Sequence, residues 1–174
     1  MMLEVDVLSI KQIEQSYLHK LRKLVYLLAI STPGSPNVSQ LSNDIETSRA
    51  TVMNYLKYLK DARLINMLYN KEDEFPKKPV MLYMQNPNLL YSVRPNRVDE
   101  QALRETFFYN QVHKDYKVNV GIKDAQFLVD NTYNFRIEDS NSKGKVNPAL
   151  YYARDDMEVG DGNVIPLWLF GFLY

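Results

Sequence analysis

The sequence contains no cysteine and only two histidines, His19 and His113, among its 174 residues. The absence of cysteine excludes disulfide bonds and thiolate metal sites, and it fits a reducing compartment, so we expect a cytoplasmic location. No apolar run approaches the roughly 20 residues that span a bilayer, and the N-terminus lacks the pattern of a secretory signal. We expect no membrane contact, no metal ion and no cofactor.

The sequence also lacks an excess of charge of either sign, because 21 basic side chains balance 21 acidic ones. The charges are nevertheless distributed unevenly. Residues 11–63 carry eight basic and four acidic residues, a net charge of +4, whereas residues 99–174 carry eight and twelve, a net charge of −4. The first half is therefore better suited to phosphate than the second.

Residues 37–62 have the pattern of a helix-turn-helix. Four apolar residues of its second helix stand at i, i+3, i+4 and i+7 and share one face: Val52, Tyr55, Leu56 and Leu59. The opposite face carries Ala50, Asn54, Lys57 and Asp61. Thr47 or Ser48 is expected to cap this helix. Such a helix can enter a DNA major groove, or it can complete a small trihelical core that never touches DNA.

The surrounding residues predict a winged helix. Residues 9–30 read as one long helix with an apolar stripe, stopped by Pro33 and Pro36. A short helix is expected over 39–45. Residues 63–70 alternate apolar and polar positions as a strand does, 71–78 form a charged turn and 79–85 a second strand. Lysines of this wing either contact a phosphate backbone or only keep an exposed hairpin soluble: Lys71, Lys77 and Lys78.

The second half predicts a small α+β unit. We expect a loop over 86–96, a helix over 99–115, and strands near 116–122, 125–130, 133–138 and 149–155. Asn131-Thr132 is a plausible hairpin turn, and the apolar tail 163–174 is expected to fold against the core. The fold class is therefore α+β, with domains at 1–86 and 87–174.

Several stretches resemble one known family. In chain order they are PNVSQLSNDIETSRATVMNYLKYLKDARLI, KKPVMLYMQNPNLLYSV, LRETFFYNQV, FLVDNTYNFRIE and DDMEVGDGNVIPLWLFGFLY. Together they resemble the C-terminal half of bacterial and archaeal AAA+ type ATPases. The resemblance implies a winged helix followed by a domain of uncharacterised function that is similar to the PD-(D/E)XK restriction-endonuclease fold. No P-loop is present, because the only Gly-Lys pair, Gly144-Lys145, is followed by Val146.

The resemblance also locates a degenerate nuclease site. In the family a helical glutamate, a strand aspartate and a glutamate on the next strand hold Mg²⁺. The matching positions here are Glu105, Gln126 and Arg136. One carboxylate is replaced by an amide and another by a cation, so we expect no catalytic residues. Asp130 and Glu138 face the same sides of their strands but lie further along.

Two functions remain open at this point. The first is a non-catalytic DNA-binding protein, with a winged-helix interface made of Arg49, Asn54, Lys57, Lys60, Lys71, Lys77 and Lys78. The second is a protein-interaction or regulatory module that docks an ATPase partner or associates with itself. An active metal-dependent nuclease is the least favoured alternative, since two of the three carboxylates are missing.

Overall fold

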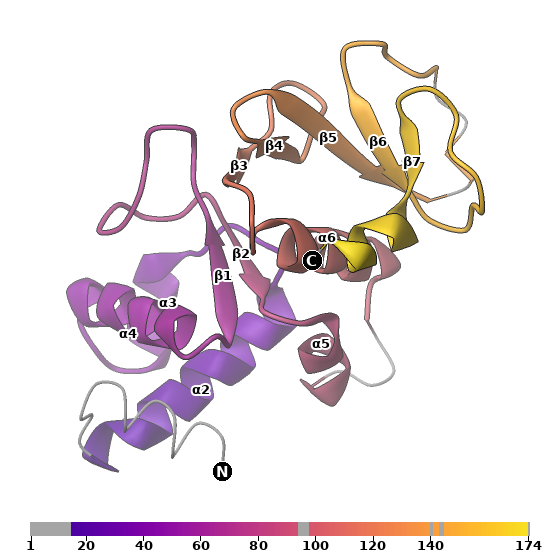
Figure 1. Cartoon of the computed structure of the whole chain (residues 1–174). Helices are drawn as coiled ribbons and strands as arrows, with labels where there is room; N and C mark the ends of the chain where they lie inside the picture. Colours follow the sequence, from indigo (N-terminus) through magenta and orange to yellow (C-terminus); the bar gives the residue numbers. More distant parts are fainter. Residues whose placement is uncertain (1–14, 94–97, 140, 143–144, 174) are drawn as a thin grey trace.

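The computed structural model describes residues 15–93, 98–139, 141–142 and 145–173. It has mixed α+β architecture: helices and a two-stranded sheet in the first half, and a helix with a five-stranded sheet in the second (Figure 1). The α+β fold class is thereby confirmed.

Three helices form the N-terminal part of the described chain: α2 (Gln15–Ser31), α3 (Val38–Asp44) and α4 (Arg49–Asp61). The predicted long helix is observed as α2, and its residues 9–14 lie outside the described residues. Asn37 caps α3 by accepting a hydrogen bond from the backbone N–H of Gln40 at 3.1 Å. Such caps satisfy helix N–H groups that have no partner within the helix.

The two strands that follow pair antiparallel, β1 (Ile65–Leu68) with β2 (Met81–Met84). The strand predicted over 63–70 is confirmed as β1, and all four of its residues are buried, including the polar Asn66. Ile65 and Met67 belong to a core formed with α2, α3 and α4, whereas Leu68 belongs to a core formed with the second half. Both faces of β1 are therefore covered.

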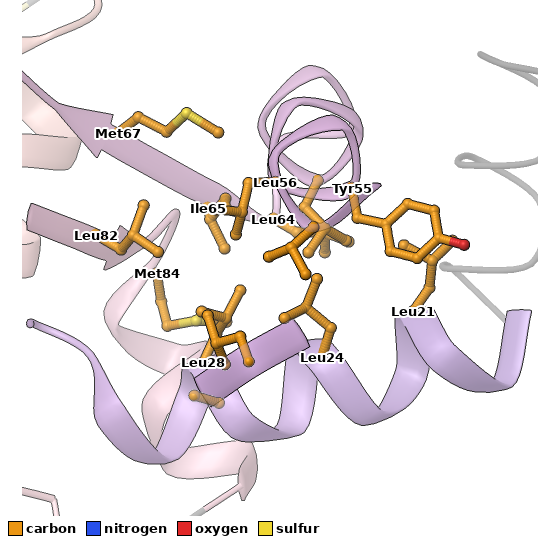
Figure 2. Packing of buried hydrophobic residues seen from close by; sticks show 14 of the residues in the cluster. Leu21, Leu24, Leu28, Tyr55, Leu56, Leu64, Ile65, Met67, Leu82 and Met84 are labelled. Atoms are coloured by element: carbon orange, nitrogen blue, oxygen red, sulfur yellow. The ribbon is translucent and has the colours of Figure 1, made fainter. Parts of the chain in front are cut away.

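The first core lies between α2, α4 and the β1–β2 pair. Figure 2 shows leucines of α2 pointing toward α4 and the two strands. Leu21, Leu24 and Leu28 are buried as the apolar stripe predicts, but Tyr17 of the same stripe is 44% exposed. The buried face of α4 consists of Val52, Tyr55, Leu56 and Leu59, as predicted from the spacing.

The segment predicted as a loop after residue 86 is a helix, α5 (Pro87–Val93). Proline favours the first position of a helix, where its missing N–H is no loss. The Oδ1 atom of Asn86 accepts a hydrogen bond from the backbone N–H of Asn88 at 2.9 Å, and Leu90 is buried in the first core. The proline and asparagine that suggested a loop in fact begin a helix.

The second half starts with α6 (Glu100–Val112), capped by Asp99, and continues with the sheet. The strands lie in chain order: β3 (Val118–Val120), β4 (Phe127–Val129), β5 (Tyr133–Glu138), β6 (Tyr151–Arg154) and β7 (Val164–Pro166). The first three are antiparallel, and β5, β6 and β7 are parallel. Helix α6 packs against one face with the 3-10 helix η2 (Leu167–Phe172) beside it (Figure 1).

The predicted hairpin turn in the second half needs correction, whereas the predicted packing of the tail is confirmed. The turn between β4 and β5 has Asp130 and Asn131 at its centre, both with positive φ (48° and 57°), not Asn131-Thr132. These are the residue types that tolerate the left-handed region. The apolar tail folds against the core as predicted, since Leu167 and Phe170 of η2 are buried there, while Trp168 and Phe172 remain 49% and 61% exposed.

The second core is aromatic and crosses the predicted domain boundary. Phe108 of α6 contacts the rings of Phe127, Phe135 and Phe170. Leu68 and Tyr83, which precede residue 87, are buried in the same cluster. Within the described part of the chain, no helix combines the length and the apolar character needed to cross a membrane.

Candidate functional site

The N-terminus of α4 is fixed by Ser48. Its Oγ accepts a hydrogen bond from the backbone N–H of Thr51 at 3.1 Å and also contacts the Thr51 hydroxyl at 2.8 Å. Of the two predicted capping residues, Thr47 and Ser48, the one that caps α4 is therefore Ser48. The apolar face of α4 is buried, so the polar face of its first turn is exposed.

The outward face of α4 carries the predicted DNA-contacting residues. Arg49, Asn54 and Lys60 are exposed, and none of their side chains forms an ion pair or hydrogen bond with another described residue. Lys57 differs, because its ammonium group pairs with the Asp61 carboxylate one turn later. The charge of Lys57 is thus already balanced, which the spacing of residues alone did not indicate.

The lysines of the predicted wing lie on the segment that joins β1 and β2. Lys71, Lys77 and Lys78 are exposed. Lys77 pairs with Asp73, and this contact lowers the pKa of the carboxyl group. Residues 71–78 contain three lysines and three acidic residues, so the wing carries no net charge. The net charge of this segment therefore does not support the predicted phosphate contacts of the wing lysines.

The three positions of the predicted degenerate site come together. Glu105 of α6, Gln126 immediately before β4 and Arg136 of β5 all line one cavity of about 500 Å³, which we call the polar cavity. Asp124 and Asp139 also line it, and sequence analysis had not singled out either residue.

Glu105 is held by two hydrogen bonds inside the protein. The amide of Gln101 donates to one carboxylate oxygen at 3.0 Å, and the Tyr83 hydroxyl donates to the other at 3.2 Å. Burial raises the pKa of Glu105 above its ordinary value, against the opposing effect of these two bonds. Tyr83 comes from β2 in the first half, and nothing in the sequence linked it to Glu105.

Gln126 uses its side-chain oxygen within the sheet. Oε1 accepts a hydrogen bond from the backbone N–H of Ile137 at 3.0 Å, and the Ile137 carbonyl accepts one from Gln101 at 2.9 Å. The amide oxygen that could have served as a weak metal ligand therefore already has a partner. Gln126 joins β4 to β5 next to the cavity.

Arg136 and Arg154 share the carboxylate of Glu138. The Nε of Arg136 lies 2.7 Å from one oxygen, and a terminal nitrogen of Arg154 lies 3.1 Å from the other. Glu138 is only 8% exposed. Asp130 lies in the hairpin turn, where it accepts a hydrogen bond from the backbone N–H of Lys117 at 2.9 Å. Among the described residues, no group of three or more acidic or histidine side chains could hold a metal ion.

The environment of Glu105 gives a prediction about stability. A raised pKa means that the fold favours the protonated acid, so ionisation costs stability once the pH exceeds the ordinary value of 4.5. Glu105→Gln is therefore expected to raise the melting temperature at pH 7, and the gain should shrink toward pH 4. The Tyr83 hydroxyl can turn from donor to acceptor to suit the amide.

Thermal denaturation followed by circular dichroism at both pH values measures this effect. Glu158→Gln at an exposed position is the matched control and should change little at either pH. A Glu105→Gln variant that melts lower than the parent protein at pH 7 would contradict the assignment.

Comparisons with known proteins give one match. Residues 1–94, more than half of the chain, match a family model described as "Domain of unknown function (DUF8612)". Neither the curated proteins nor the solved structures contain a match to this chain.

Proposed function

The chain belongs to the DUF8612 family, a domain of unknown function, and we propose that it binds duplex DNA through the outward face of α4. In this proposal α2, α3 and α4 with the β1–β2 pair act as a winged helix, and α4 is the recognition helix. The N-terminal residues of such a helix contact base edges, while the flanking cations contact phosphates.

The observation that carries the proposal is the polar face of α4, on which Arg49 and Asn54 have side chains without a partner among the described residues. Arg49 and Asn54 are exposed, and no other described side chain pairs with them. Arginine and asparagine are the side chains that most often form paired hydrogen bonds with guanine and adenine, respectively. Helix α4 begins at Arg49, so this side chain stands in the first turn.

Charge adds a second line of support. Residues 48–63 hold four basic residues and one acidic residue, a net charge of +3, in a chain whose total is zero. Cations concentrated on one helix attract phosphate and release counterions from DNA. The cysteine-free composition also fits the proposed cytoplasmic location.

The second half enters the proposal as a non-catalytic relative of PD-(D/E)XK nucleases. Support comes from the convergence of Glu105, Gln126 and Arg136 in the polar cavity. The guanidinium of Arg136 lies where a nuclease would need a carboxylate, and a fixed cation repels a divalent metal. The proposed relationship to the C-terminal half of AAA+ type ATPases rests on the sequence resemblance.

Fluorescence anisotropy with a labelled duplex of mixed sequence tests the DNA proposal. In about 50 mM salt we expect binding that weakens steeply as salt is added. Arg49→Glu should weaken binding by about tenfold or more, because it reverses a charge at the interface. A glutamate in the first turn suits the helix dipole, so the variant should still fold.

Two comparison variants sharpen the result. Lys57→Ala should have a smaller effect than Arg49→Glu, because Lys57 is already paired with Asp61. Lys145→Glu reverses an exposed charge in the second half and should leave binding unchanged. No binding up to about 100 μM protein in low salt, or equal binding by the parent protein and Arg49→Glu, would overturn the proposal.

The alternative role, a protein-interaction module that docks an ATPase partner or a second copy of this chain, stays a prediction. Size-exclusion chromatography with light scattering distinguishes it from a monomeric DNA-binding protein. A monomer that binds DNA as described would count against that role.

A further inference from the structure

A surface with exposed apolar side chains lies over α5, α6 and η2. Tyr91 of α5 is 48% exposed, and Trp168, Leu169 and Phe172 of η2 are 49%, 41% and 61% exposed. Together with Phe107 of α6, which is half-buried, they form what we call the η2 face. Exposed apolar residues that gather in one patch mark interaction surfaces, whereas single exposed ones do not.

The members of the η2 face adjoin one another. Tyr91, Phe107 and Trp168 line one groove of about 310 Å³. The rings of Trp168 and Phe172 meet edge to face at a centroid distance of 5.9 Å. Leu169 stands three residues before Phe172 in η2, so both side chains lie on the same side of this 3-10 helix. The groove and the exposed ring of Phe172 are therefore neighbours on one surface.

The charged side chains and the indole of the groove already have partners within the protein. The Nε of Arg104 donates to a carboxylate oxygen of Asp155 at 3.0 Å, and a terminal nitrogen of Arg104 donates to Glu100 at 3.0 Å. The indole N–H of Trp168 donates to the Met157 carbonyl at 3.0 Å. These groups are not available to select a polar ligand, so the groove suits an apolar side chain from another protein surface.

The exposed apolar area of the η2 face is close to what one side of a stable dimer needs. An aromatic side chain has about 150–250 Å² of surface, so the half-exposed Tyr91, Trp168 and Phe172 together leave roughly 300 Å² exposed. A standard interface buries about 800 Å² on each partner, and a little over half of that area is apolar. The three rings supply most of this apolar share, and Leu169 adds to it.

The η2 face is also complementary to itself. A two-fold dimer uses the same surface on both copies, so one part of that surface must fit another part of it. Here a groove adjoins an exposed ring, so Phe172 of one copy can enter the groove of the other and the exchange is mutual. The two charged side chains of the groove, Arg104 and Asp155, are paired with each other. Two copies of the groove therefore meet without opposing unpaired like charges.

We propose that the η2 face is a dimer interface, in which a second copy of this chain inserts Phe172 into the groove beside Tyr91 and Trp168. Helix α4 lies on the other side of the molecule from α5 and η2 (Figure 1), so the outward face of α4 remains exposed on both copies. This inference goes beyond duplex binding by α4 and does not depend on it. It gives the self-association predicted from the sequence a defined surface.

Sedimentation equilibrium without DNA tests the proposal. We expect the mass to rise from that of one chain toward that of two, with a dissociation constant below about 100 μM. Phe172→Glu and Tyr91→Glu should each weaken the association by at least about tenfold, because each brings a charge into the apolar interface from both copies. Both positions are exposed, so neither variant should disturb the fold. Tyr26→Glu replaces a ring of α2 that is 56% exposed outside the η2 face, and it and Arg49→Glu should dimerise as the parent does.

The fluorescence of Trp168 reports on this surface, because Trp168 is the only tryptophan and belongs to the η2 face. Its emission should move to shorter wavelength as the protein concentration rises, with the same midpoint as the mass. This shift should persist in about 500 mM salt, which strongly weakens DNA binding by α4. A protein that is still monomeric at about 500 μM would overturn the proposal and leave the η2 face to a different protein. A dimer that forms without a change in Trp168 emission, or that Phe172→Glu and Tyr91→Glu leave intact, would overturn it as well.

Discussion

Replacing Phe108 by alanine is expected to lower the free energy of unfolding by about 3–5 kcal/mol, the usual cost of removing a fully buried aromatic side chain. Phe108 has no exposed surface. Its ring lies 4.8 to 5.2 Å, centroid to centroid, from Phe127, Phe135 and Phe170. Backbone relaxation cannot easily fill the space, because these neighbours come from two strands and from η2.

Chemical denaturation measures this loss as a shift of the midpoint at constant slope. Phe107→Ala removes a neighbouring ring that is only half-buried and serves as the matched control with a smaller loss. Two signals should shift together: circular dichroism, which reports the helices of both halves, and the fluorescence of Trp168, the only tryptophan. A loss no larger than that of Phe107→Ala would contradict the central position of Phe108.

The joint shift is expected because the second core reaches across residue 86. Leu68 and Tyr83 pack in that core, and the Tyr109 hydroxyl donates to the Met67 carbonyl at 3.0 Å. The Asn110 amide donates to the Gln85 carbonyl. Sequence patterns place a boundary where composition changes, but they do not show which buried side chains cross it.

The helices of the first half could be predicted because their apolar spacing is regular. Helix α6 and strands β1 to β6 also lie within predicted segments, whereas α5 and the burial of β1 depend on tertiary packing. Residues 87–93 look like a loop in isolation, yet Pro87 suits the first helical position and Leu90 finds a buried place. In the same way the burial of Asn66 and Leu68 could not be predicted, because their packing against the second half cannot be inferred from the sequence of β1 alone.

For the polar cavity, the sequence indicated some of the lining residues but not their hydrogen-bond partners. The resemblance selected Glu105, Gln126 and Arg136, and the fold brings them to one cavity. Their partners were not foreseeable, because Tyr83 and Glu105 are 22 residues apart and meet only through the fold.

The second large effect is expected at the arginine pair on Glu138. The parallel register of β5 and β6 places Arg154 opposite Glu138, and the two are 19% and 8% exposed at their side chains. Arg154→Met leaves the buried Glu138 carboxylate with only the more exposed Arg136 as counter-charge, so it should cost about 3 kcal/mol, the low end of the range for breaking a buried ion pair. Arg136 contacts the other carboxylate oxygen, but its side chain is 40% exposed and water can replace it. Arg136→Met is therefore expected to cost less than about 1 kcal/mol.

A double-mutant cycle isolates the coupling between the strands. Glu138→Met combined with Arg154→Met removes both charges and places two apolar side chains opposite each other, so the double variant should recover much of the loss seen in Arg154→Met. Denaturant titration of the parent, the two single variants and the double variant gives the coupling energy directly. Equal losses of unfolding free energy in Arg154→Met and Arg136→Met would contradict the prediction that the more buried arginine contributes more to stability. With the predicted asymmetry, Arg154 is the arginine that stabilises Glu138 in the sheet, and Arg136 is left as the cation that faces the polar cavity.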